Sequence, residues 1–205
     1  MKLPFLTSVI LFILVLGHRI RRQNRVSEKN NRSFWEREAA ANATRRKSLD
    51  GLNFITIPLE ELPYELLADD EQVADCVELL RTLSTQKIVN LTGFTNTELK
   101  LQYGAPNITE LSEYDQNYTL LVRTLQKWAD LLWDKGYHEE AVCIMEFAIS
   151  THTDISRTYY LLAEYWSARG ELTPIRQLVT MAETLHSANK NVILRTLQDT
   201  YLSEK

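Results

Sequence analysis

Two short groups of titratable residues are the places in this 205-residue chain where chemistry could occur. His138-Glu139-Glu140 and His152-Thr153-Asp154 each place an imidazole beside carboxylates, a combination used in acid–base catalysis and in metal binding. Neither group has the spacing of a metal-ligand set, and neither has a nucleophile beside it. We therefore predict no catalytic residue, no metal ligand and no cofactor, and we do not expect an enzyme.

The chain also lacks the motifs that announce common substrates. It contains no phosphate-binding glycine loop, no Cys-x-x-Cys pair and no Gly-x-Ser-x-Gly sequence. Neither a small-molecule substrate nor a nucleic-acid partner is predicted. Because His152 and His186 end two equivalent predicted helices, the preference of helix C-termini for basic residues explains both without catalysis.

An internal repeat of 34 residues surrounds these histidines. Residues 122–155 laid over residues 156–189 give six identities: Arg123/Arg157, Thr124/Thr158, Ala129/Ala163, Gly136/Gly170, Ala148/Ala182 and His152/His186. This period is typical of helix-turn-helix solenoids, which bind other polypeptides. Glycines are expected to end the first helix of each copy in a left-handed turn, and the shared alanines allow close packing of paired helices.

Periodicity and capping residues predict the helices that would carry the repeat. We expect helices over residues 70–85, 112–135, 139–151, 153–169 and 173–189, with a last amphipathic helix over residues 191–202 that covers the end of the solenoid. Ser112 with Asp115, Thr153 and Thr173-Pro174 are the predicted helix starts. Residues 54–57 look like a brief β-like stretch, and residues 97–103 like a short helix.

The repeat resembles the tetratricopeptide repeat. With Gly136 placed on the family's inter-helix glycine, Ala129, Leu132, Ala141 and Ala148 fall on its small and large positions, and Ala163, Trp166, Gly170 and Ala182 match in the second copy. The chain departs from the pattern at Ile175 and lacks the terminal prolines, having Thr153 and Ser187 instead. The resemblance implies a concave partner-binding face made of Arg123, Gln126, Asp130, Trp133, Arg157, Tyr160 and Glu164.

The amino-terminal residues 3–17 form an apolar run, followed by Arg19, Arg21, Arg22 and Arg25. Counted to Ile20, about 18 residues would span a thin bilayer. A cleaved signal would carry its charge before the run, and here the charge follows it. We therefore expect a retained transmembrane helix with the arginines flanking the membrane, a single-pass location in the cell membrane and a cytoplasmic C-terminal body. The whole chain is similar to uncharacterised membrane-anchored helical proteins of Gram-positive bacteria.

Charge divides the chain into a basic arm and an acidic body. Residues 18–47 carry a net charge of +7, and residues 48–205 carry −12. A capping box at Ser33 and Glu36 predicts a short helix over residues 36–49 that lies on anionic lipid or is simply solvated.

Cys76 and Cys143 look like buried free thiols, although a disulfide remains open. Five Asn-x-Ser/Thr triplets, at Asn31, Asn42, Asn90, Asn107 and Asn117, would matter in an extracellular glycoprotein.

These observations predict an all-α fold, in which an N-terminal transmembrane helix precedes a solenoid similar to tetratricopeptide repeats with a C-terminal capping helix. The expected organisation is an anchor at 1–20, a basic juxtamembrane linker and short helix at 21–50, an irregular helical section at 51–111 and the repeats at 112–205. The function that fits is a membrane-tethered cytoplasmic adaptor that binds a protein or peptide through its helical surface. The alternative is a structural or assembly subunit of a membrane complex without a discrete peptide groove.

Overall fold

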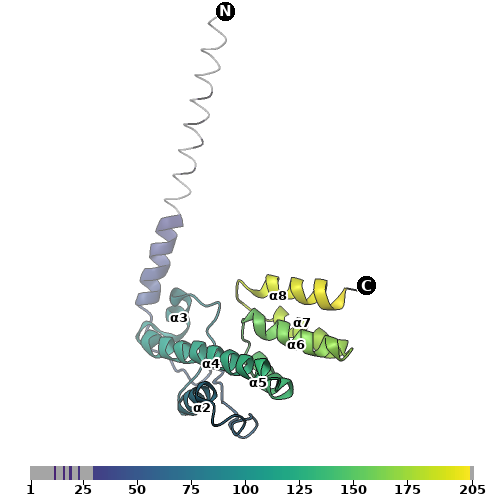
Figure 1. Ribbon diagram of the computed structural model, residues 1–205. Helices are drawn as coiled ribbons and strands as arrows, with labels where there is room; N and C mark the ends of the chain where they lie inside the picture. The colour runs from purple at the N-terminus through teal and green to yellow at the C-terminus, as the bar shows by residue number, and fades with distance from the viewer. Residues whose placement is uncertain (1–11, 13–15, 17–18, 20–22, 24–29, 204–205) are drawn as a thin grey trace, which may run out of the picture. The chain divides into compact units, whose positions relative to one another are not determined.

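The computed structural model describes residues 12, 16, 19, 23 and 30–203 (Figure 1). Its regular elements are helices, and no β-strand occurs among these residues, which confirms the all-α prediction. The chain divides into two compact units. Unit 1 comprises residues 1–48 and 95–108, and unit 2 comprises residues 49–94 and 109–205.

The predicted transmembrane anchor is wrong for the part of the chain that the structure describes. No helix within those residues is both long and apolar enough to cross a bilayer. The longest, α4 (Ile108–Asp134), has ample length but carries charged side chains along it. The single-pass fold and the membrane location with a cytoplasmic body are corrected accordingly. Of the apolar run 3–17, Phe12 and Leu16 alone are described, and the rest lies outside the described residues.

The four predicted membrane-flanking arginines fall in the same region. Arg19 is exposed, while Arg21, Arg22 and Arg25 lie outside the described residues.

Unit 1 contains a helix over residues 30–42, α3 (Asn96–Tyr103) and the 3-10 turn η1 (Ala105–Asn107). The predicted helix over residues 36–49 therefore starts and ends several residues earlier than expected. Ser33 is not its cap, because Ser33 Oγ donates 2.8 Å to the Asn30 carbonyl inside the helix. Ser33 lies within the helix, where its hydroxyl bonds back to the preceding turn.

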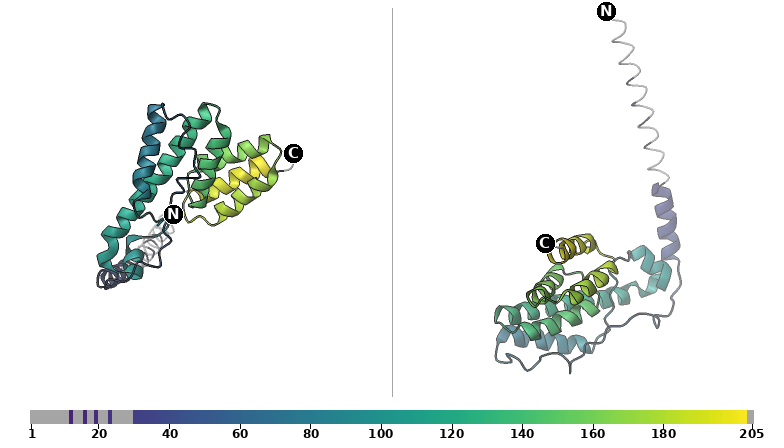
Figure 2. Two further views of the ribbon diagram at one scale, coloured as in Figure 1. Left: turned by 90° about the horizontal axis from the view of Figure 1, so that it is seen from below. Right: turned by 90° about the vertical axis from the view of Figure 1, so that its right-hand side faces the viewer.

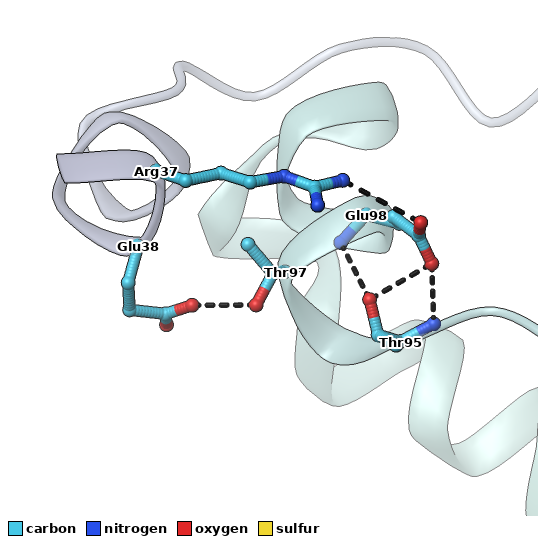
Figure 3. Close-up of polar contacts among 5 residues, drawn as sticks. All are labelled: Arg37, Glu38, Thr95, Thr97 and Glu98. Carbon is cyan, nitrogen blue, oxygen red and sulfur yellow. Dashed lines mark hydrogen bonds and ion pairs between the residues drawn. The ribbon is translucent and has the colours of Figure 1, made fainter. Parts of the chain in front are cut away.

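Polar contacts join the first helix of unit 1 to α3 (Figure 3). Thr95 and Glu98 form a reciprocal capping box at the start of α3, with the Thr95 amide donating 2.9 Å to Glu98 Oε2. Arg37 pairs with the same carboxylate at 3.4 Å. Glu38 accepts from Thr97 Oγ1 at 2.6 Å and from Lys100 Nζ at 2.5 Å. These contacts hold the pKa values of Glu38 and Glu98 below their usual range, chiefly through the side-chain bond from Lys100 and the backbone bond from Thr95 respectively.

Unit 2 holds the remaining elements, of which α6, α7 and α8 lie side by side in Figures 1 and 2. Their bounds are α2 (Glu71–Ser84), α4 (Ile108–Asp134), α5 (His138–Ser150), α6 (Ser156–Ala168), α7 (Leu172–Glu183), α8 (Lys190–Thr196) and the π-helical segment η2 (Leu197–Leu202). A single apolar cluster runs through these helices, with Trp128, Leu162, Ile175 and Ile193 fully buried. The final segment α8–η2 packs on α6 and α7, as expected of a covering helix.

Local capping explains where the prediction of helix starts succeeded and where it failed. The helix predicted over residues 70–85 forms as α2, and Asp70 is its cap, accepting from the Val73 amide at 3.1 Å. Helix α4 begins at Ile108 instead of Ser112, and Asp115 Oδ1 accepts from the Leu91 amide at 3.1 Å. Thr153 is also not the cap of α6, which is preceded by Ile155, and Pro174 is the third residue of α7.

The two turns between paired helices have the same geometry. In the first, the amides of Gly136 and Tyr137 donate to Trp133 and Leu132; in the second, the amides of Gly170 and Glu171 donate to Ser167 and Trp166. Each donor and acceptor is displaced by 34 residues from its counterpart. Both glycines have positive φ, +86° and +73°, as predicted, and this left-handed conformation is costly for any residue with a Cβ.

Candidate functional site

Several of the residues predicted to form a concave face form hydrogen bonds with one another. Asp130 Oδ1 accepts from Arg157 Nε at 2.7 Å and from Gln126 Nε2 at 2.9 Å. Gln126 Oε1 in turn accepts from Thr158 Oγ1 at 2.5 Å. This network ties the first helix of one repeat to the first helix of the next. Three of the seven residues therefore have a structural role within unit 2.

The other four are divided between packing and exposure. Trp133 is half-buried, its ring 4.5 Å from that of His138 and 6.3 Å from that of Tyr165. Tyr160 is half-buried against the apolar cluster. Arg123 and Glu164 are exposed. A binding role for this face stays a prediction; Arg123, Arg157 and Glu164 are its exposed members.

A pocket of about 600 Å³ lies elsewhere in unit 2. Two segments without regular secondary structure, residues 53–56 and 90–94, and the C-terminal ends of α5 and α7 surround it. Its lining residues are Asn53, Phe54, Ile55, Thr56, Asn90, Thr92, Phe94, Phe147, Ser150, Thr151, His152, Asp154, Thr184, Leu185, His186 and Ser187. The volume falls within the range of ordinary ligand pockets.

Two repeat-related triplets account for six of the sixteen lining residues. Ser150 is the last residue of α5, and Thr151 and His152 follow it. The equivalent triplet Thr184-Leu185-His186 lies 34 residues later, directly after α7. Both triplets line the pocket, and His152 Nδ1 lies 3.2 Å from Thr184 Oγ1. The pocket is therefore the place where the corresponding ends of two repeats meet.

Asn90 fixes the segment 90–94 against the end of α5. Its side-chain nitrogen lies 2.9 Å from the Tyr118 hydroxyl and 3.1 and 3.2 Å from the carbonyl oxygens of Thr151 and His152. Its side-chain oxygen accepts from the Thr92 amide at 2.9 Å. Sequence reasoning noted Asn90 only as part of a glycosylation triplet, and no local signal indicates its bridging role, because its partners lie 28 to 62 residues away.

The residues predicted to be β-like form the opposite wall. Residues 53–57 have no regular secondary structure, and no strand forms within the described residues. The Phe54 amide donates 3.0 Å to the Leu52 carbonyl, and the Ile55 amide donates 2.9 Å to the Ile88 carbonyl. The amide of Thr56 has no hydrogen-bond partner among the described residues, so this wall offers part of a peptide edge.

Both histidines of the repeat have a defined place at the pocket. His152 has a φ of +59°, which places it in the left-handed region directly after α5. His186 lies against Gly93, where a Cβ would come 2.7 Å from the histidine Cβ. Gly93 has a φ of +94°, so both backbone conformation and close approach require glycine there.

Polar side chains of the pocket retain binding capacity. Asp154 is half-buried, and its carboxylate receives a long 3.5 Å contact from Asn189 Nδ2. Ser187 Oγ is buried without a hydrogen-bond partner in the described structure. Beneath the pocket, burial raises the pKa of Tyr118 and that of Tyr159, so both hydroxyls stay neutral. They donate to the carbonyls of Thr151 and Thr153 at 3.3 and 3.0 Å.

The first group of titratable residues serves structure. His138 stacks on Trp133, and Glu139 pairs with Arg169 at 3.3 Å. Within the described residues, no cluster of histidine, cysteine, aspartate and glutamate has the arrangement of a metal site. Both cysteines are free thiols, and burial raises the pKa of each, which favours the unreactive protonated form.

Comparison with known proteins identifies no relative: no family model, no curated protein and no solved structure matches the chain.

Proposed function

We propose that unit 2 is a protein-interaction module that holds a segment of a partner polypeptide in the pocket between the ends of α5 and α7. The observation that carries this proposal is the convergence of two repeat-related triplets, residues 150–152 and 184–186, on one pocket. Helical repeats bind polypeptides on surfaces that neighbouring repeats share. The resemblance to tetratricopeptide repeats supports the same class of function, although its concave face is a different surface.

The composition of the pocket suits a peptide. Apolar rings from Phe54, Phe94 and Phe147 stand beside amide, hydroxyl and imidazole groups. Such a mixture buries part of a ligand while orienting it through a few hydrogen bonds. The wall at residues 53–56 adds the Thr56 amide, which has no partner among the described residues and could donate to the backbone of a partner chain.

A substitution that fills the pocket tests the proposal. Ser150 is exposed at the end of α5 and lines the pocket, so Ser150→Trp places a bulky ring there without entering the apolar core. Ser167 is an exposed serine near the end of α6 that does not line the pocket, and Ser167→Trp is the matched control. The full chain is panned against a phage-displayed random-peptide library, and selected peptides are synthesised for titration.

The expected result is a set of peptides that bind the natural chain and Ser167→Trp alike and lose at least tenfold in affinity for Ser150→Trp. Circular dichroism and thermal unfolding show whether each variant is folded. Peptides that bind Ser150→Trp as well as the natural chain would place recognition elsewhere, and Arg123→Glu then tests the predicted concave face. Failure of any peptide to be selected would refute the module itself.

A further inference from the structure

The charge of the pocket indicates what kind of side chain it takes. No lysine or arginine lines it, and Asp154 is its one formally charged residue when the two imidazoles are neutral. A cation does lie close by, since Lys87 Nζ is 5.5 Å from the centroid of the pocket-lining Phe54 ring. Lys190 of α8 donates 2.5 Å to the Glu183 carbonyl at the end of α7. The C-terminus of a helix adds partial negative charge, and two such termini meet here. Asp154 and the two helix C-termini favour a cation, and the start of α6 at Ser156 opposes them.

Asp154 lacks the partner that a half-buried carboxylate usually has. It forms no ion pair with any described residue, and its one side-chain contact is the 3.5 Å approach of an amide. In the second repeat the equivalent position is Ala188, so the acid comes from one copy alone. The pocket is consequently asymmetric, with its carboxylate at the α5 end.

Aromatic rings and an unused hydroxyl narrow the choice of cation. Phe54, Phe94 and Phe147 line the pocket, and guanidinium groups stack on aromatic faces while binding carboxylates with two parallel bonds. Lys87 Nζ already lies over the Phe54 ring, 5.5 Å from its centroid, so a bound guanidinium would stack on Phe94 or Phe147. Ser187 Oγ, buried and unpaired, can accept a further N–H. A lysine ammonium is a compact, strongly hydrated point charge and uses such a planar set of contacts less well.

We propose that the pocket recognises the guanidinium group of an arginine carried by an extended segment of the partner, with Asp154 as its carboxylate partner. This inference rests on the proposed function and specifies its ligand. Unit 2 supports it at long range, because its sequence contains 11 lysines and arginines against 23 aspartates and glutamates, a net charge of −12. Such a field attracts basic segments.

The test uses the peptide that binds the full chain best through the pocket, and three synthetic versions of it. These carry arginine, lysine or citrulline at the arginine position of the selected peptide. Citrulline is a neutral analogue of arginine with nearly the same shape. Binding is measured by fluorescence anisotropy, in one buffer for all peptides and protein variants. The protein variants are Asp154→Asn and, as a matched loss of one exposed charge in α2, Asp75→Asn.

We expect the arginine peptide to lose about tenfold or more in affinity when arginine becomes citrulline, and a similar factor when Asp154 becomes asparagine. Asp75→Asn should change affinity by less than about twofold, since it lies outside the pocket. The citrulline peptide should bind the natural chain and Asp154→Asn equally, because the charge pair is already lost.

Several outcomes would overturn the inference. Equal binding of the lysine and arginine peptides would remove the guanidinium assignment, and equal binding of citrulline would remove the cation. Selection of pocket-dependent peptides that lack arginine would refute the inference while leaving the proposed function in place. Because the citrulline comparison uses the natural protein, it remains decisive even if Asp154→Asn fails to fold.

Discussion

Two tyrosines in unit 2 permit the same chemical change with opposite expected effects on stability. The Tyr64 hydroxyl is buried without a hydrogen-bond partner in the described structure, its ring centroid 5.3 Å from that of Trp128. The Tyr118 hydroxyl is buried too, but accepts from Asn90 at 2.9 Å and donates to the Thr151 carbonyl at 3.3 Å. Replacing each by phenylalanine removes one oxygen from an otherwise similar environment.

The structure sets the size of both effects. An unpaired buried polar group costs about 1 to 3 kcal/mol of desolvation, so Tyr64→Phe should raise the free energy of unfolding by about 1 kcal/mol. Tyr118→Phe loses two hydrogen bonds worth about 0.5 to 1.5 kcal/mol each. Asn90 and the Thr151 carbonyl still bond to each other at 3.1 Å, which limits the loss to about 1 to 2 kcal/mol.

Urea unfolding measures the two changes. With a denaturant slope of about 2 kcal/mol per molar, the unfolding midpoint should rise by about 0.5 M for Tyr64→Phe and fall by about 0.5 to 1 M for Tyr118→Phe. Because Tyr118 supports the wall of the pocket, peptide affinity should fall in that variant alone. Midpoints that fall equally in both variants would show that the Tyr64 hydroxyl has a bonding role and would refute the reasoning.

Alkaline pH supplies an independent measurement on Tyr64. Burial raises the pKa of Tyr64 to about 12 from an ordinary value of 10.0, opposed by the positive charge of Arg81. The folded state holds the phenol neutral, whereas the unfolded state lets it ionise from about pH 10. The full free energy of unfolding is therefore present below pH 10, and part of it is lost as pH rises toward 12. Two pKa units correspond to at most about 2.7 kcal/mol, and solvent screening of this half-buried phenol makes the change smaller. The free energy of unfolding should therefore fall less steeply with pH over this interval in Tyr64→Phe than in the natural chain. Equal slopes in the two proteins would contradict the raised pKa of Tyr64.

Three further substitutions test other parts of the fold. Gly93→Ala should cost more stability than Gly136→Ala and should weaken peptide binding. Both glycines have positive φ, but of the two only a Cβ at position 93 would meet a neighbour, at 2.7 Å. Thermal melts and peptide titrations compare the two variants. Asn107→Ala should cost about 2 to 4 kcal/mol and speed hydrogen exchange in residues 43–48, because the buried amide bonds Arg46, Lys47 and Tyr103 at 2.7 to 2.8 Å. A double-mutant cycle on Arg157 and Asp130 should give a coupling of about 0.5 to 1 kcal/mol that fades at high salt, as expected for a part-exposed pair.

Helix positions could be predicted where the information is local. The apolar spacing of Val73, Cys76, Val77 and Leu80 matches the buried face of α2, and Asp70 caps it. Gly136 and Gly170 end helices because a left-handed residue favours glycine whatever surrounds it. Burial of Ala129, Ala163 and Ala182 to 0% exposure likewise follows from the repeat.

Other features depended on contacts that sequence does not display. A hydroxyl or carboxylate near a helix start can cap it or bond elsewhere, and Asp115 is used by Leu91, 24 residues away. The wall formed by residues 53–56 meets helix ends about 100 residues later in the chain, and Asn90 bridges across 62 residues. Hydrophobic periodicity contains no information on such long-range contacts, so the pocket could not be predicted. The repeat showed only that its two histidines occupy equivalent positions.

The two ends of the repeat have diverged to different degrees, and this difference bears on where binding occurs. At the turns after Asp134 and Ala168 the backbone hydrogen bonds are the same in both copies. At the opposite ends, His152 adopts a positive φ while His186 packs against Gly93, and Asp154 stands where the other copy has Ala188. A turn that only joins helices gains nothing from differing between copies, whereas an asymmetric pocket fixes the direction of a bound chain. We therefore expect exchange of Asp154 and Ala188 between the copies to leave the fold intact and to abolish binding of the arginine peptide; retained affinity would mean that the position of the carboxylate does not matter.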